Sequence, residues 1–138
     1  MTVEQQAGMP TAAEAASVAE FRVALRRFQR QSDIVARECG ITPSWYQLLL
    51  QIKGAPDLSE QTTVTALAQR LQLAQSSVTE LVARAEQAGL IERTSSRDDA
   101  RVVLLRLSGP GEEVFARAFR SLAAERDALR EAIAGLDG

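Results

Sequence analysis

The sequence predicts a mainly helical α+β protein, in which a helix–turn–helix and a small β-hairpin lie between two long terminal helices. Three observations predict this fold. Both ends of the chain carry apolar residues at heptad spacing, which is typical of long helices that pack against other helices. The middle holds two short amphipathic segments separated by a break at 72–74. After Gly89, two runs rich in β-branched residues flank a polar tip, as in a hairpin.

The first long helix is expected within residues 11–40, after a flexible tail at residues 1–10. Its apolar residues alternate between spacings of three and four, which makes an unbroken heptad seam. The seam consists of Val18, Phe21, Leu25, Phe28, Ser32, Val35 and Cys39. Gly40 is expected to end this helix, because glycine readily adopts the left-handed conformation that follows a helix C-terminus.

The central lobe is expected at residues 41–108 and begins with a bridging helix at 41–53. Thr42 is a suitable N-cap for that helix, and Pro43 suits its first position. The inner positions are Trp45, Leu48, Leu49 and Ile52. The cluster of Gly, Ala, Pro and Asp at 54–57 predicts a turn, which a polar stretch follows up to Thr62.

The two helices of the helix–turn–helix come next. Thr63 is expected to cap the first, and the second is expected over Gln75–Ala88, closed by Gly89. Spacings of three and four predict which residues of both helices face inward. These are Val64, Leu67, Ala68 and Leu71 in the first helix, and Val78, Leu81, Val82 and Ala85 in the second.

The chain is expected to finish with the hairpin and one more long helix. The predicted strands are 90–93 and 102–107, with a polar tip at 94–101. Ser108 and Pro110 predict the start of the last helix, which forms the second terminal segment at 109–138. Its heptad seam is Phe115, Phe119, Leu122, Arg126, Leu129, Ile133 and Leu136.

Composition excludes several kinds of site in this 138-residue chain, which has the length of one domain. Without histidine, neither a Ser-His-Asp site nor a histidine-bound metal can form, and no catalytic residue, metal or cofactor is expected. The only cysteine, Cys39, cannot form an internal disulfide and fits a reducing compartment. The chain shows neither a basic start followed by an apolar core nor a membrane-spanning run, so a cytoplasmic protein without a membrane partner is expected.

The charge distribution bears on nucleic-acid binding. The formal net charge of −2 argues against a generic polyanion binder, since such proteins are usually basic. Residues 62–107, however, carry six arginines against five acidic residues. The central lobe is therefore slightly positive, while both flanking segments are acidic.

Polar side chains on the second helix and arginines near the hairpin are candidate DNA contacts. Short hydrogen-bonding side chains and arginine suit base edges and phosphates, and a basic hairpin can reach an adjacent groove. On the helix these residues are Gln75, Ser76, Ser77, Thr79, Glu80 and Arg84, and around the hairpin they are Arg93, Arg97, Asp99 and Arg101. The alternative interpretation is that these residues form an ordinary solvated surface.

Three stretches of the sequence resemble the MarR family of bacterial winged-helix transcriptional regulators. They are ITPSWYQLLLQIKG, TALAQRLQLAQSSVTELVARAEQAGLIER and DDARVVLLRLSGPG. Asp99-x-Arg101 is similar to the family's wing signature, and Leu107-Ser108-x-x-Gly111 is similar to its entry into the last helix. The order and spacing of these motifs make the resemblance specific, and it extends from about residue 20 to residue 133.

The resemblance implies a homodimeric winged helix-turn-helix that binds double-stranded DNA, most often as a repressor of pseudo-palindromic operators. In such a dimer, Ser76, Ser77, Thr79 and Arg84 contact the major groove, Arg101 reaches the minor groove, and Asp99 orients Arg101. The terminal helices form the dimer interface, through Val18, Phe21, Leu25, Phe115, Phe119, Leu122, Leu129 and Ile133. Glu80 departs from the basic residue that many relatives have, and Ala74 departs from their Ser or Thr cap.

The resemblance also implies a small aromatic or phenolic effector bound between the dimer helices and the DNA-binding lobe. Candidate contacts are Phe21, Arg22, Phe28, Trp45, Tyr46 and Leu49, although the same aromatic residues suit a core. Cys39 has an alternative role as an oxidant sensor, as in some relatives, besides that of a small buried apolar residue.

Two other functions compete with this interpretation. Glu80 and the acidic balance would suit a winged-helix protein-interaction module whose DNA binding is weak or lost. An enzyme would have to use carboxylate pairs, and no acidic residue lies within an apolar run that could shift its pKa.

Overall fold

The computed structural model describes residues 8–137, so most of the tail expected at residues 1–10 lies outside the described part of the chain. The elements follow one another in an order that matches the sequence-based prediction of a helical protein with a hairpin. They are α2 (Ala12–Glu38), α3 (Pro43–Lys53), β1 (Gln61–Thr62), α4 (Val64–Leu71), α5 (Gln75–Gln87), β2 (Ile91–Ser95), β3 (Val103–Leu107), α6 (Gly109–Ser121), α7 (Ala123–Ala134) and the short 3₁₀ helix η1 (Gly135–Asp137).

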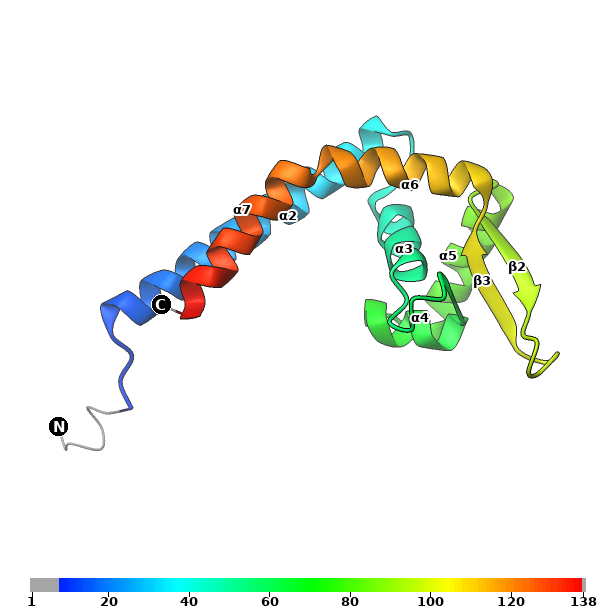
Figure 1. Ribbon diagram of the computed structural model, residues 1–138, viewed down its shortest axis with the longest axis horizontal. Helices are drawn as coiled ribbons and strands as arrows, with labels where there is room; N and C mark the ends of the chain where they lie inside the picture. Colours follow the sequence, from blue (N-terminus) through cyan, green and yellow to red (C-terminus); the bar gives the residue numbers. More distant parts are fainter. Residues whose placement is uncertain (1–7, 138) are drawn as a thin grey trace.

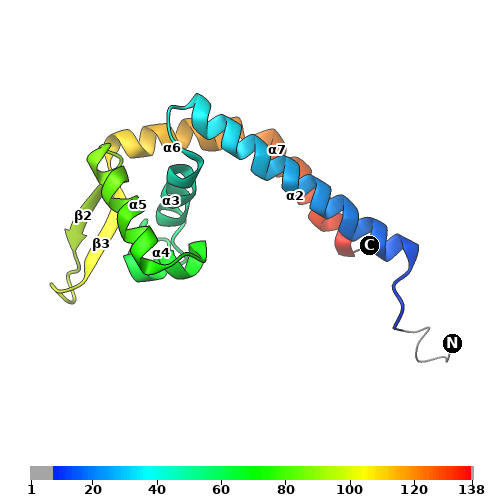
Figure 2. The same cartoon turned by 180° about the vertical axis from the view of Figure 1, so that it is seen from behind.

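The molecule consists of a lobe and a long arm (Figure 1). Helices α2 and α7 run side by side in opposite directions and form the arm, and α6 continues from it across the top of the lobe (Figures 1 and 2). With 27 residues, α2 is about 40 Å long at the usual helical rise. The lobe contains α3, α4, α5 and the sheet.

Side-chain caps fix where four of the helices begin. Thr11 and Glu14 form a reciprocal capping box at the start of α2. The hydroxyls of Thr42, Thr63 and Ser108 accept hydrogen bonds from the backbone N–H groups three residues later, at α3, α4 and α6. These three caps confirm the helix starts predicted from the sequence.

The core of the lobe is aliphatic, as the inward positions predict. Its largest fully buried side chains include Leu48, Leu49, Ile52, Leu67, Val78, Val82 and Leu105. Aromatic residues lie above this core, where the lobe meets the arm: the rings of Tyr46 and Phe115 stack with centroids 5.8 Å apart, and Phe119 lies beside Phe115. Trp45, predicted to face inward, is only partly buried.

The sheet has one strand more than the sequence predicted. Its strand order is β1-β3-β2, with both pairs antiparallel. Strand β1 lies in the polar stretch before Thr63, for which the sequence predicts no strand. A two-residue strand has no periodicity of its own; it forms because Gln61 and Thr62 pair with Arg106 and Leu105 of β3. The hairpin tip is also shorter than predicted, since Thr94 and Ser95 pair with β3.

The prediction of a single last helix is wrong, because the helix is interrupted at Leu122, between α6 and α7. The Ser121 hydroxyl donates to the Arg117 carbonyl, a contact that often bends helices. The Phe119 carbonyl accepts from the backbone N–H of Leu122 and from the Arg126 guanidinium, which also covers the Phe119 ring. Arg126, the one charged residue in the predicted heptad seam, therefore supplies a hydrogen-bond donor to the Phe119 carbonyl at the interruption.

Candidate nucleic-acid interface

Helix α5 is held in the lobe by one face and presents the other to solvent. Val78, Val82 and Ala85 are fully buried and fix the rotation of the helix about its axis. The opposite face carries the predicted recognition residues, all of them exposed: Gln75, Ser76, Ser77, Thr79, Glu80 and Arg84. The structure thus leaves all six residues predicted on this helix accessible to a partner.

The start of α5 lacks a side-chain cap, as expected from Ala74. Instead, the Gln75 carboxamide contacts the preceding helix α4, where it donates a hydrogen bond to the Thr65 hydroxyl over 3.3 Å. The N–H groups of the first turn of α5 have no acceptor within their own helix, a position where anions such as phosphate bind well.

Two recognition residues already have partners within α5. The Thr79 hydroxyl donates to the Gln75 carbonyl over 2.9 Å, which leaves its oxygen able to accept. The Arg84 guanidinium lies 2.6 Å from the Glu80 carboxylate, one turn away, and both side chains are about two-thirds exposed. Glu80 therefore binds the only arginine in the predicted recognition set.

The arginines predicted at the hairpin have three different surroundings. Arg93 lies in β2, where its Nε donates to both carboxylate oxygens of Glu86, at 3.0 and 2.9 Å. This contact ties the base of the hairpin to α5. Arg97 is exposed and lines a polar cavity on the sheet, whereas Arg101 projects from the tip.

Asp99 holds Arg101 through both its backbone and its side chain, which is the pairing expected from the sequence. One carboxylate oxygen accepts from the Arg101 backbone N–H over 3.0 Å and from its Nε over 3.1 Å. These hydrogen bonds hold the pKa of Asp99 below its usual value. With 91% of its side chain exposed, Arg101 remains free to contact a partner.

The residues predicted for an effector site are distributed over the arm and the core. Tyr46 and Leu49 are buried in the core, and burial raises the pKa of Tyr46, partly offset by Arg126. Phe28 lines a cavity of about 280 Å³ between α2 and α7. Arg22 is exposed on α2, where Phe21 is half-buried.

A larger apolar cavity, of about 530 Å³, lies between α3 and α6, where the arm meets the lobe. Leu50, Phe115 and Phe119 supply apolar lining, and Lys53 and Arg120 supply positive charge. Lys53 forms ion pairs with Glu112 of α6, at 3.0 Å, and with Glu60. The hydrogen bonds that it donates to the Glu60 and Glu112 carboxylates raise its pKa. This cavity was not predicted from the sequence, because the residues that line it are far apart along the chain.

The residues predicted for a dimer interface differ in how much surface they leave for a partner. Phe115 and Leu122 are buried within their own chain, and Phe21, Leu25 and Leu129 are half-buried. Val18, Phe119 and Ile133 are exposed, at 50%, 37% and 48% of their surface. Cys39 caps the end of α2 and is partly exposed.

Two features are absent from the part of the chain that the structure describes. Between residues 8 and 137, no three His, Cys, Asp or Glu side chains are grouped so that they could hold a metal ion. No helix in the same part of the chain is long and apolar enough to cross a membrane.

Two helices joined by a short turn, with a third helix behind them and a hairpin beside them, define a winged helix-turn-helix protein. Residues 40–102 match the family model of the MarR family. This region of the chain is therefore a winged helix of the MarR family, whose members are transcription regulators rather than enzymes.

Known proteins support this assignment. A Thauera aromatica protein, described as a candidate transcriptional regulator for the hcr operon, is 36% identical over 94 residues, which are 68% of this chain. The match spans only about half of that protein, 52% of its length. The transcriptional regulator Tm0710 of Thermotoga maritima superposes with a TM-score of 0.61 at 28% identity, over 85% of this chain and 77% of that one. A mutant E. coli MarR complexed with operator DNA shares the fold, with a TM-score of 0.62 at 20% identity over 80% of this chain and 75% of that one.

Proposed function

We propose that this chain acts as a homodimeric, DNA-binding transcriptional repressor whose operators are pseudo-palindromic. The observation that carries the proposal is the exposed polar face of α5, with the Arg101 side chain projecting from the hairpin on the same lobe. Serine and threonine hydroxyls and an arginine on α5 suit a major groove, and the exposed Arg101 suits the neighbouring minor groove. Two lobes in a dimer would bind half-sites about 10 bp apart.

The arm supports dimerisation in this proposal. Val18 and Ile133 leave about half of their surface exposed near the far end of the arm, where the start of α2 lies beside the end of α7. Exposed apolar residues in a heptad seam are typical of a helix that packs against a second copy.

The apolar cavity between α3 and α6 supports relief by an effector. Its Phe115 and Phe119 rings suit an aromatic ligand, and Arg120 suits the negative charge of a phenolate or carboxylate, since Lys53 is already paired with Glu60 and Glu112. The cavity lies where the arm meets the lobe. An occupant that favours one angle between arm and lobe would therefore change the distance between the two α5 helices of the dimer.

The Arg101→Ala variant tests DNA binding. We expect it to weaken binding to duplexes of different sequence by a similar factor, about tenfold, and to reduce the salt slope by about one unit. The reason is that a positioning arginine contributes mainly by neutralising one phosphate. Fluorescence anisotropy titrations of labelled promoter duplexes at four salt concentrations give both quantities, with the exposed Arg117→Ala in α6 as a charge-matched control. Unchanged affinity and slope would disprove the role of the hairpin.

The Glu80→Gln variant is expected to bind duplex DNA about three- to tenfold more tightly than wild type at low salt. Glutamine removes a negative charge beside the phosphates and releases Arg84 from its 2.6 Å ion pair. Part of the gain should be lost when Glu80→Gln is made in an Arg84→Ala background and measured by the same titration, because no guanidinium is then released. If Glu80→Gln instead weakens binding to one sequence only, Glu80 accepts a hydrogen bond from a base, such as cytosine N4.

A second candidate function follows from the same ion pair. With Arg84 neutralised by Glu80, the α5 face could instead contact another protein, and DNA binding would be weak. Absence of any salt-dependent duplex binding by the wild-type dimer would favour this protein-interaction module.

A further inference from the structure

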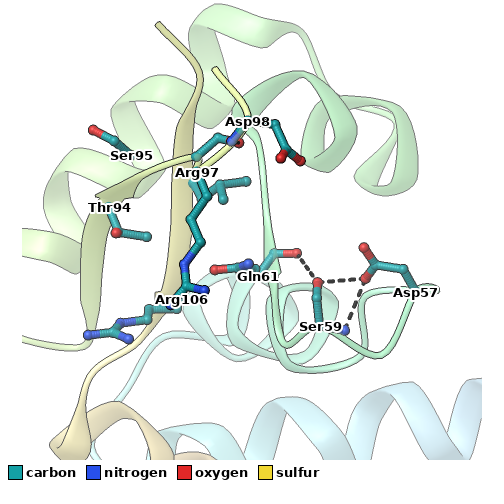
Figure 3. Close-up of a pocket in the computed structure, with 10 residues that line it drawn as sticks. Asp57, Ser59, Gln61, Thr94, Ser95, Arg97, Asp98 and Arg106 are labelled. Carbon is teal, nitrogen blue, oxygen red and sulfur yellow. Dashed lines mark hydrogen bonds between the residues drawn. The ribbon is translucent and has the colours of Figure 1, made fainter. Parts of the chain in front are cut away.

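The polar cavity on the sheet, of about 620 Å³, lies between the hairpin and the segment that leads into β1 (Figure 3). The strand register places it on the outer face of the sheet. Leu105 and Leu107 of β3 point into the core, so the alternate residues Leu104 and Arg106 point outward. Gln61 and Arg106 lie directly opposite each other in the register, and Thr94 faces Leu104 in an adjacent row.

Two arginines line this cavity from different directions. The side chain of Arg97 extends back from the hairpin tip along the sheet, toward Gln61 and Arg106 (Figure 3). Within residues 8–137, Arg97 has no ion pair, while Arg106 is 3.2 Å from the Glu92 carboxylate. Both arginines therefore line one cavity, and of the two only Arg106 is paired with a carboxylate in the described part of the chain.

The rest of the lining is also hydrophilic. Hydroxyl groups come from Ser59 and Thr94, and Gln61 provides a carboxamide. The Asp57 carboxylate at the edge accepts from the Ser59 backbone N–H, at 3.1 Å, and from its hydroxyl, at 2.6 Å, so those hydrogen bonds partly satisfy it. Asp98 also lines the cavity and suits a hydroxyl donor on a ligand.

This chemistry differs from that of the apolar cavity between α3 and α6. Guanidinium groups form strong paired hydrogen bonds with phosphate and carboxylate oxygens, and hydroxyls add weaker ones. We propose that the cavity on the sheet binds a small hydrophilic ligand that carries a phosphate or carboxylate group, with Arg97 and Arg106 as its anion-binding pair.

One consequence rests on the proposed DNA-binding function. Arg97 belongs to the hairpin that is proposed to reach the minor groove. A ligand that holds its side chain over the sheet removes one cation from the DNA surface, so occupancy of the cavity lowers the affinity for DNA.

The direct test is a titration of ¹⁵N-labelled full-length protein with inorganic phosphate and, separately, with succinate. Chloride keeps the ionic strength constant. We expect saturable shifts of the backbone amides at 94–97 and 104–106, and the tighter of the two probes identifies the preferred anion. In Arg106→Gln the dissociation constant of that probe should rise at least about tenfold, the loss expected for a charged pair of hydrogen bonds.

Arg93→Gln is the matched control. It removes the same charge from the same sheet, but Arg93 is paired with Glu86 of α5, away from the cavity. Its anion affinity should stay within twofold of wild type. Equal losses in both variants, or shifts that follow ionic strength alone, would overturn the proposal.

DNA titrations with and without the preferred anion, at constant ionic strength, test the consequence. The anion should weaken DNA binding by wild type about threefold and leave Arg106→Gln unaffected. If DNA binds but the anion does not, the cavity proposal fails alone; if the anion binds but DNA does not, the proposed function fails alone. If the anion binds and DNA affinity does not respond, the site exists without the regulatory consequence.

Discussion

Replacing Gly111 with alanine is expected to destabilise the protein by about 3 kcal/mol, at the upper end of the cost of overpacking a well-packed site. Gly111 is buried in the first turn of α6. An added Cβ would lie 2.1 Å from the Leu90 carbonyl oxygen and 3.0 Å from its carbon. A methyl group therefore fits only if α6 moves away from the segment between α5 and β2.

That movement is opposed by the hydrogen bonds around Leu90. Its carbonyl accepts from the Ser108 backbone N–H, and its own N–H donates to the Ala85 carbonyl, each over 3.0 Å. The Ser108 hydroxyl in turn donates to the Gly89 carbonyl and accepts from the Gly111 N–H. Relief of the clash would break several of these contacts at once, so the backbone cannot adjust at low cost.

Gly135→Ala is the control for this prediction. A Cβ at Gly135 meets nothing within 4 Å, and its φ of −64° and ψ of −19° are helical values that suit alanine. Urea unfolding at one fixed protein concentration, followed by circular dichroism, should give a stability within about 1 kcal/mol of wild type, or slightly higher. Similar midpoints for the two variants would show that the contact between Gly111 and Leu90 is not close in solution.

Local chemistry determined the parts of the fold that were predictable. Thr42, Thr63 and Ser108 cap their helices with their own hydroxyls, so the relevant partners are three residues away. The rotation of α5 about its axis was also predictable, because Val78, Val82 and Ala85 recur at helical spacing.

Features that depend on distant partners were not predictable. Strand β1 exists through its pairing with β3. The interruption at Leu122 is local, but the heptad pattern runs through it and no Gly or Pro marks it. The site shows the same division. The exposed α5 residues follow from periodicity, whereas the surroundings of Arg93 and Arg97 depend on Glu86 and on the cavity.

The Val18→Glu variant is expected to convert the proposed dimer to a monomer and to weaken binding to a two-half-site duplex at least about 100-fold. Val18 lies on the heptad seam of α2 and is 50% exposed within its own chain. A second copy would bury the remaining surface, and a carboxylate there would lose its hydration without a partner. Loss of the dimer makes the second half-site a separate binding event, which accounts for the fall in affinity.

Light scattering after size-exclusion chromatography measures the oligomeric state, and anisotropy with duplexes of one and two half-sites measures binding. Ala16→Glu is the control, because it adds the same charge to the same turn at an exposed position on the opposite side of α2. Both variants should keep the wild-type circular dichroism spectrum. Since each lobe stays intact, Val18→Glu should bind the single half-site as wild type does. A dimeric Val18→Glu protein with full affinity would show that the arm does not join two copies at this position.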